Sequence, residues 1–299
     1  MKKIIGLVLG LFLLVVIIYP VWTVYFRHAG KTASIEIITG DSTRAIGENL
    51  KQKKVISSSL LFSWYVYSKH SLLQTGVYDI ESDMTLPQIV TMLVEGKSKE
   101  FLVTIPEGWR VTQIDALLAD RKIIKAGEFT KVASSDEGYL FPDTYKIPLD
   151  AKPEDIRDLM TTNFKKQTEE KKVDNQAIII ASIVEREAKF DDDRAKIAGV
   201  YLSRLDIGMR LEADPTIQYG KGSWDAIKLS DYKNFISPYN TYLIDGLPPS
   251  PICNPGLESI LAVANPVKDG SLFFFHKTDG YAVYSKTMAE HEANLQKYR

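Results

Sequence analysis

The sequence predicts an α+β protein that has one membrane-spanning helix at its N-terminus and two α+β domains after it. Three observations lead to this prediction. Residues 4–26 form an uncharged apolar run, residues 34–105 alternate short strand patterns with helical ones, and helical periodicity broken by loops follows. With 299 residues, 45% of them hydrophobic, the chain is long enough for about two domains with cores of their own.

The apolar N-terminal segment is the clearest physical signal. Ile4–Phe26 contains no charged residue and has about the length that a helix needs to cross a bilayer. Lys2 and Lys3 precede it, and aromatic residues gather near its far end, where they prefer the headgroup level. The segment predicts a single-pass anchor in the cytoplasmic (inner) cell membrane, with residues 1–3 cytoplasmic and the rest extracytoplasmic. A cleaved signal peptide is the alternative, but the run is longer than a signal core.

Residues 27–100 predict a small α+β domain. Strand patterns and capped helical patterns alternate in it: strands at 34–39, 76–80 and 101–105, and helices that begin after Gly40-Asp41-Ser42, Ser57-Ser58-Ser59 and Thr85. The second helix is crowded with large apolar and aromatic side chains, which favours a place in the core over a platform for sugar rings. These side chains are Leu60, Leu61, Trp64, Tyr65 and Tyr67.

A domain boundary is predicted near Glu100, so that residues 101–299 form the second and larger domain. Ile105-Pro106-Glu107-Gly108 ends the strand pattern, and a new helix begins at Val111. The charged segment between Ala151 and Asp174 is typical of a solvated helix face.

Asn175–Lys189 is apolar on nearly every side, which indicates a buried helix. Its β-branched run would also suit a central strand, but its length and its alanine and glutamate content favour a helix. On that helix Glu187 shares a face with Ile180, Ile183 and Val184. An apolar environment stabilises the neutral form of a carboxyl group, so Glu187 is a candidate proton donor near neutral pH.

Glu185 lies on a different face of the same helix. It is grouped with Ala181 and Ser182, and Lys189 follows one turn later, a spacing that suits an ion pair. For both glutamates the plainer interpretation is surface charge at a helix end.

Overall charge and cysteine count narrow the possible partners. The formal net charge of -1 supplies no positive field for a phosphate backbone, so nucleic acid is not an expected partner. Cys253 is the single cysteine, which excludes an intramolecular disulfide and a thiolate metal cluster. The four histidines have no metal-binding spacing, and there is no glycine-rich phosphate loop and no nucleophile elbow. We therefore expect neither a metal ion nor a cofactor.

After a helix predicted over Asp191–Leu205, residues 210–249 are rich in amide, hydroxyl and aromatic side chains. Such loops suit a sugar, because its hydroxyl groups need fixed hydrogen bonds and its ring faces pack on aromatic surfaces. Taken one at a time, the same residues are more often parts of turns or caps.

Four separated blocks of this sequence resemble those of the MltG/YceG-like endolytic murein transglycosylases. The blocks are EGYLFPDTYKIP, ASIVEREA, RLDIGMRLEADPTIQYG and SPYNTYLIDGLPPSPICNPG. The resemblance covers roughly Phe101–Arg299, and residues 27–100 resemble the family's LysM-like subdomain in the order of their elements. It implies a LysM-like α+β subdomain followed by a larger α+β YceG-like catalytic domain.

The resemblance also implies an activity. An enzyme of this kind is a lytic transglycosylase that cleaves the β-1,4 bond between N-acetylmuramic acid (MurNAc) and N-acetylglucosamine (GlcNAc) in nascent peptidoglycan strands. It leaves a 1,6-anhydro-MurNAc end and so terminates glycan elongation close to the membrane. Penicillin-binding proteins and other cell-wall synthesis proteins are candidate partners.

The family's catalytic glutamate aligns with Glu187, and Glu185 is the fallback. Matching blocks imply further residues that bind the sugar or brace Glu187, namely Glu185, Asp214, Gln218, Tyr219, Asn240, Thr241, Glu137 and Tyr145. For the block that holds Glu137 and Tyr145, a core-packing turn is an equal alternative.

Two other functions fit the same sequence. A non-catalytic scaffold could bind peptidoglycan and recruit synthesis enzymes, although a pure binder has no need of an acid on the apolar face of a buried helix. A soluble extracytoplasmic hydrolase would need cleavage after the apolar segment and a second carboxylate that faces Glu187.

Overall fold

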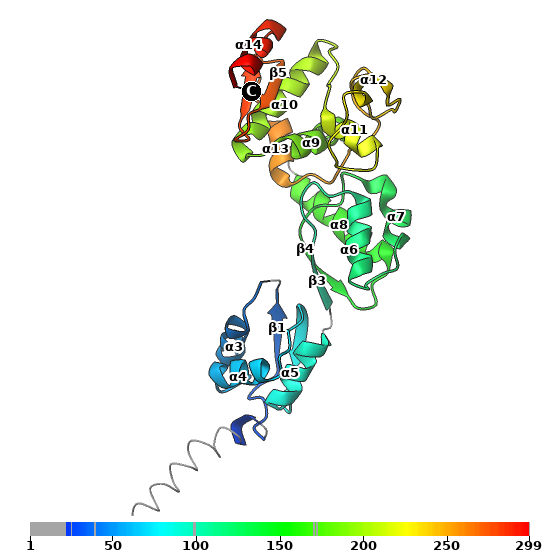
Figure 1. Ribbon diagram of the computed structural model, residues 1–299. Coiled ribbons are helices and arrows are strands. Elements are labelled where there is room, and N and C mark those ends of the chain that lie inside the picture. The colour runs from blue at the N-terminus through cyan, green and yellow to red at the C-terminus, as the bar shows by residue number, and fades with distance from the viewer. Residues whose placement is uncertain are drawn as a thin grey trace, which may run out of the picture. The chain divides into compact units, whose positions relative to one another are not determined.

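The computed structural model describes residues 22–24, 26–38, 40–97, 100–169, 171 and 173–298 (Figure 1). The predicted span Ile4–Phe26 lies outside these residues except for its last few positions. Within the described ranges, no helix combines the length and the apolar character that a membrane crossing requires.

The described residues form two compact units. Those up to Val103, together with Thr144–Asp150, make up the first unit, and Thr104–Asp143 with Ala151–Arg299 make up the second. Only one boundary, near Glu100, is predicted from the sequence, whereas in the structure the chain returns to the first unit at Thr144–Asp150.

A four-stranded sheet forms the centre of the first unit. Its strands are β1 (Ala33–Ile37), β2 (Gly76–Ile80), β3 (Glu100–Thr104) and β4 (Thr144–Pro148), in the order β1-β2-β3-β4. The pairs β1–β2 and β2–β3 are antiparallel, and Ile35 lies opposite Tyr78. Both of these side chains are buried, so the alternation of the strands turns one face of the sheet to the core.

Three helices complete this unit, and their starts follow the predicted caps. They are α3 (Thr43–Gln52), α4 (Ser59–Ser68) and α5 (Leu86–Glu95). The hydroxyls of Ser42 and Ser58 accept hydrogen bonds from backbone N–H groups of the first turns of α3 and α4. Gly96 ends α5 at a φ of 68°, in the left-handed region that glycine adopts without strain.

One expectation for α4 is wrong. Tyr65 is buried, as predicted, but Leu60, Trp64 and Tyr67 are 75%, 61% and 63% exposed. The helix is apolar on both faces, whereas the sheet and the neighbouring helices can cover only one of them.

The second unit is mainly helical, with one hairpin. Its elements are α6 (Val111–Asp120), α7 (Glu128–Ala133), a 3₁₀ turn (Ser134–Asp136), α8 (Pro153–Thr168), α9 (Asn175–Glu187), α10 (Asp191–Asp206), α11 (Asp214–Gly220), α12 (Asp231–Asn234), α13 (Leu257–Ala264), β5 (Phe273–His276), β6 (Ala282–Ser285) and α14 (Met288–Tyr298). The mixed α+β class that the sequence predicts is confirmed.

The helix α9 lies at the centre of the core of the second unit. It packs against α10, α11 and α13, and its residues from Ile178 to Val184 are all buried. This surrounding of α9 explains its apolar character on all sides and confirms the helix over the alternative strand. The side chain of Asp174 caps its N-terminus by accepting from the N–H of Ala177 at 2.8 Å.

Candidate active site

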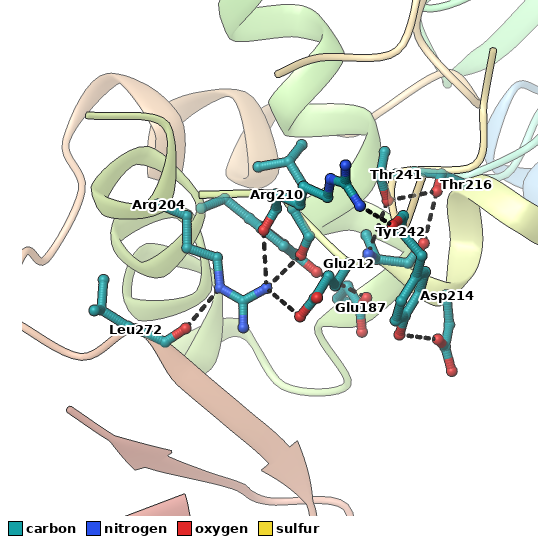
Figure 2. Close-up of polar contacts among 12 residues, drawn as sticks. Glu187, Arg204, Arg210, Glu212, Asp214, Thr216, Thr241, Tyr242 and Leu272 are labelled. Atoms are coloured by element: carbon teal, nitrogen blue, oxygen red, sulfur yellow. Dashed lines mark hydrogen bonds and ion pairs between the residues drawn. The ribbon is translucent and has the colours of Figure 1, made fainter. Parts of the chain in front are cut away.

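Glu187 is the last residue of α9 and lines a cleft of about 340 Å³. The other walls come from α10, the chain around Glu212, the start of α11, α12 and the loop after it, the hairpin strand β5 and α14. The lining residues are Tyr201, Arg204, Leu211, Glu212, Asp214, Tyr232, Tyr242, Phe274, Phe275, His276, His291 and Leu295. Figure 2 shows the polar contacts around the carboxyl group of Glu187.

The environment of Glu187 favours the neutral acid, as its position on the helix predicts. The pKa of this carboxyl is raised from its ordinary 4.5 to about 7, chiefly by burial and to a smaller extent by the nearby charge of Asp214. A hydrogen bond from Tyr201 and the charge of Arg204 act in the opposite direction. The C-terminal end of α9 carries the negative end of the helix dipole, which also disfavours a carboxylate there. Glu187 can therefore give up or accept a proton near neutral pH.

Tyr201 of α10 is the direct partner of Glu187. Its hydroxyl donates to Oε1 of Glu187 at 2.9 Å, and the side chain is only 2% exposed. Burial first, and the charge of Glu187 next, raise the pKa of Tyr201 well above its ordinary range, so it stays protonated as a donor. A buried, fully protonated donor fixes the direction in which the carboxyl group points.

Arg204, near the end of α10, joins three segments behind the cleft. Its Nε donates to the carbonyl of Leu272 at 2.7 Å, and its Nη1 donates to the carbonyls of Arg210 and Leu211 at 3.2 and 2.7 Å (Figure 2). The same Nη1 lies 3.4 Å from Oε2 of Glu212. Because these carbonyls belong to the chain before α11 and before β5, Arg204 holds both walls against α10.

The wall that carries Asp214 is fixed by a second set of hydrogen bonds. The hydroxyl of Thr241 accepts from the N–H of Ala213 at 2.9 Å and lies 2.9 Å from the hydroxyl of Thr216. This pairing places Tyr242 so that its hydroxyl donates to Oδ1 of Asp214 at 2.7 Å (Figure 2).

Glu212 precedes this wall with a φ of 50°, a left-handed conformation that is uncommon for a residue with a side chain. Its N–H donates to the carbonyl of Thr241 at 3.2 Å, which holds the strained backbone in place. The turn keeps the carboxyl group of Glu212 in the lining of the cleft, beside Asp214.

Three other predicted site residues, Asn240, Thr241 and Gln218, use their side chains to hold the backbone of the surrounding loops. Thr241 and Asn240 are fully buried, which leaves them the bracing role rather than contact with a sugar. The amide of Asn240 donates to backbone carbonyls of Asp231 and Phe235, at 3.2 and 2.8 Å. Gln218 similarly donates to the carbonyl of Asp225 at 3.0 Å and closes the loop after α11.

Glu185 takes no part in the cleft lining. Its Oε2 accepts from the N–H of Gly256 at 3.0 Å and from the hydroxyl of Ser259 at 2.8 Å, and Arg194 lies 3.6 Å from its Oε1. The expected ion pair with Lys189 is wrong, because α10 and α13 approach the other side of α9 and supply these partners. Glu185 thus ties α9 to its neighbours.

Glu137, which is buried, and Tyr219, which is half-buried, lie together in a cluster separate from this cleft. The carboxyl of Glu137 accepts from the N–H of Val111 at 3.1 Å and from the side chain of Asn254 at 2.9 Å. Burial raises the pKa of Glu137 to about 7, although these hydrogen bonds lower it in part. Tyr145 is in β4 of the first unit and is buried in it. None of these three residues is in the lining of the Glu187 cleft.

Several cleft residues were missed by sequence reasoning. Arg204 and Glu212 belong to the block RLDIGMRLEADPTIQYG, so a signal for them was present. Tyr201 and His276 had no such signal, since only the packing of α10 and β5 around α9 brings them to the cleft. Among the described residues, no group of three histidine, cysteine, aspartate or glutamate side chains could hold a metal ion.

Comparison with known proteins gives consistent findings. The model of the YceG-like family matches residues 35–297. A Bacillus subtilis protein named endolytic murein transglycosylase is 35% identical over 310 aligned positions, which cover 91% of this chain and 86% of that protein. A Streptococcus pneumoniae protein of the same name is 27% identical over 91% of this chain, which spans 59% of its length. A crystal structure of a yceG-like protein from Listeria monocytogenes has a TM-score of 0.57 and 31% identity, covering 89% of this chain and all of that one.

Proposed function

The chain belongs to the YceG-like family, and from this premise we propose that it is an endolytic lytic transglycosylase acting on peptidoglycan. The relatives named endolytic murein transglycosylase support the reaction class. The observation that carries the proposal in the structure is Glu187, a carboxyl group with a pKa of about 7 in an open cleft. An acid that is protonated in part at neutral pH suits the donation of a proton to a leaving oxygen.

In the proposed reaction one carboxyl group acts twice. Glu187 donates its proton to the glycosidic oxygen between MurNAc and GlcNAc while the bond from that oxygen to C1 of MurNAc breaks. The resulting carboxylate takes the proton from the C6 hydroxyl of the same MurNAc, whose oxygen attacks C1 and closes the 1,6-anhydro ring. No water is consumed, and Glu187 ends the cycle protonated, as it began.

A hydrolase is the second candidate, because Glu212 and Asp214 place two further carboxylates in the cleft of Glu187. Most glycosidases use a pair of carboxyl groups, one as acid and the other as nucleophile or as base for water. In a transglycosylase, the negative charge of Asp214 has a different use, since it helps to keep Glu187 protonated.

The products distinguish these functions. The full chain, in detergent, is incubated with purified peptidoglycan strands, and the new ends are identified by mass spectrometry. Anhydro-MurNAc ends, lighter by one water than reducing ends, are the expected product. Reducing ends would show that the chain is a hydrolase instead. Binding without cleavage would indicate a non-catalytic scaffold.

We also propose where the reaction takes place. The apolar run that begins at Ile4 anchors the chain in the cell membrane, and both units lie outside the cytoplasm. The anchor keeps the enzyme near newly made strands, so that cleavage terminates their elongation, beside cell-wall synthesis proteins as partners. The first unit is then the LysM-like subdomain of the family.

The rate of cleavage should fall as pH rises through about 7, with its alkaline limb set by Glu187. The sign follows from the role: the first step needs the protonated acid, and the fraction of that form declines above its pKa. Measurement of kcat/KM from pH 5 to pH 9 checks this. A rate that stays constant across the alkaline range would rule out Glu187 as the acid.

Tyr201→Phe should raise the pKa of Glu187, which the alkaline limb of the pH–rate profile reports. It should also lower kcat by about tenfold, which corresponds to the free energy of one lost hydrogen bond. The phenol lowers the pKa of Glu187 and orients its carboxyl group, so the variant loses both effects. The matched control is Tyr281→Phe, because Tyr281 is 55% exposed. A slower variant with an unmoved pH profile would make Tyr201 a packing residue only.

A further inference from the structure

The exposed side of α4 is a feature of the first unit that the cleavage reaction does not use. Leu60, Trp64 and Tyr67 follow one another at spacings of four and three residues, so they share one helix face. All three are more than half exposed, and Leu72, just after the helix, is 83% exposed. We call these four residues the α4 apolar face. Such a run of large apolar side chains in water marks a contact surface.

A basic cleft of about 420 Å³ opens beside the N-terminus of α4. Its rim includes Arg27, Lys51 and Lys54, and no aspartate or glutamate is among the described residues that line it. Its floor is apolar, with buried Val55, Leu86 and Ile89 among others. Leu61 of α4 also lines it, so this cleft and the α4 apolar face belong to adjoining sides of the same helix. Cations around an apolar floor are complementary to an anionic amphiphile.

The connection to the predicted membrane segment is very short. Phe26 is the last residue of the apolar run, and Ala29 already donates its N–H to the carbonyl of Met84 at 2.6 Å. Gly30 donates to the carbonyl of Val55 at 3.2 Å, and His28 forms a bridge with Thr85. Three residues of fully extended chain reach about 10 Å. Val24 is itself buried in the core of the first unit and Thr23 lines the basic cleft, so a membrane span ends before them. The surface of the first unit around the basic cleft then lies within that distance of the headgroups.

We propose that the first unit rests on the outer surface of the phospholipid bilayer. The α4 apolar face enters the headgroup level, and the basic cleft receives the phosphate of an anionic lipid headgroup. The proposal rests on the proposed anchor but not on the proposed cleavage reaction.

The chemistry of the surface favours lipid over sugar. Tryptophan and tyrosine are enriched where a protein meets the membrane interface, and an apolar helix face flanked by cations is typical of interfacial helices. A sugar-binding face would instead need polar side chains between the aromatic rings to pair with hydroxyl groups. Besides Trp64 and Tyr67 the α4 apolar face consists of leucines, and the serines at its margin, Ser63 and Ser68, are short and uncharged. The nearby cations match the negative charge of anionic lipids.

The test uses the full chain in nanodiscs that contain either phosphatidylcholine alone or phosphatidylcholine with phosphatidylglycerol. A nitroxide label is attached at Leu60→Cys, and selective labelling is possible because the natural Cys253 is fully buried. The matched control is Leu229→Cys in the second unit, where the leucine is 87% exposed. Electron paramagnetic resonance then measures accessibility to oxygen, which concentrates in lipid, and to a water-soluble nickel complex.

The expected result is that the label at position 60 is more accessible to oxygen than to nickel, and that the label at position 229 has the reverse order. Phosphatidylglycerol should move the label at position 60 deeper into the bilayer, which raises its accessibility to oxygen relative to nickel. Lys51→Gln/Lys54→Gln should abolish this effect of phosphatidylglycerol. Lys165→Gln/Lys166→Gln, an exposed pair on α8, should leave it unchanged.

Two outcomes would overturn the proposal. In one, the label at position 60 is as accessible to nickel as the label at position 229 in both kinds of nanodisc. In the other, added glycan strands immobilise a water-exposed label at position 60, which would make the α4 apolar face a sugar platform. Cleavage measured on the same samples is a separate readout, so failure of the lipid contact is distinguishable from failure of the proposed reaction.

Discussion

Glu187→Gln is expected to reduce cleavage of glycan strands by about 10²- to 10⁴-fold, the usual contribution of general acid–base catalysis. Glutamine has nearly the shape of the neutral acid and can still meet the hydroxyl of Tyr201, but it has no proton to give. The measurement is the yield of anhydro-MurNAc ends per unit time under saturating substrate. Glu154→Gln, an exposed change on α8, is the matched control and should retain full activity. Near-normal turnover by a folded Glu187→Gln protein would falsify the assignment.

Thermal unfolding gives an independent readout for the same variant. The pKa of Glu187 is about 7 in the folded chain and 4.5 as an ordinary glutamate, so between these pH values the folded state binds more protons. Stability that this group contributes below pH 4.5 is therefore lost as pH rises to about 7. Because an amide does not titrate, Glu187→Gln should weaken the decline in melting temperature over this range and melt at a higher temperature than the wild type at pH 8. An unchanged decline would mean that folding does not raise the pKa of Glu187.

Asn254→Ala is expected to lower the free energy of unfolding of the second unit by about 3 to 5 kcal/mol. The fully buried side chain accepts from the N–H groups of Gly138 and Leu140, both at 2.9 Å. It also donates to the carbonyl of Trp109 and to Oε1 of Glu137, both at 2.9 Å. Alanine leaves these buried groups without this partner, and a charged Glu137 becomes more costly still.

The backbone around Asn254 has little room to relax. Gly138 has a φ of 92°, and a Cβ there would lie 2.5 Å from the side chain of Pro251. Melting of the full chain in detergent should therefore shift by roughly 10 °C for a unit of this size. Asn265→Ala, an exposed change after α13, is the matched control. If both variants melt alike, the buried hydrogen bonds do not hold the turn at Gly138.

The sequence predicted the local elements well because their signals are local. Hydroxyl caps at Ser42 and Ser58 begin helices where expected, and the apolar run from Ile178 to Val184 is a buried helix. The environment of Glu187 was also foreseeable, since a residue three, four and seven positions after buried ones shares their side of a helix. β4 was missed, because its pairing with β3 joins residues far apart in the sequence.

The remainder of the site depends on tertiary contacts. Periodicity indicates which residues share a face, but it does not say which face meets a neighbour. Thus Glu185 and Glu187, two residues apart on α9, have different environments because α10 and α13 cover one while the cleft opens at the other. For the same reason Leu60, Trp64 and Tyr67 are exposed although their composition suits a core. By itself the sequence determined most of the helices and strands up to α10, the family blocks and the candidate acid. Only the packing of distant segments decided which polar groups surround that acid, because hydrogen-bond partners are selected by proximity in space.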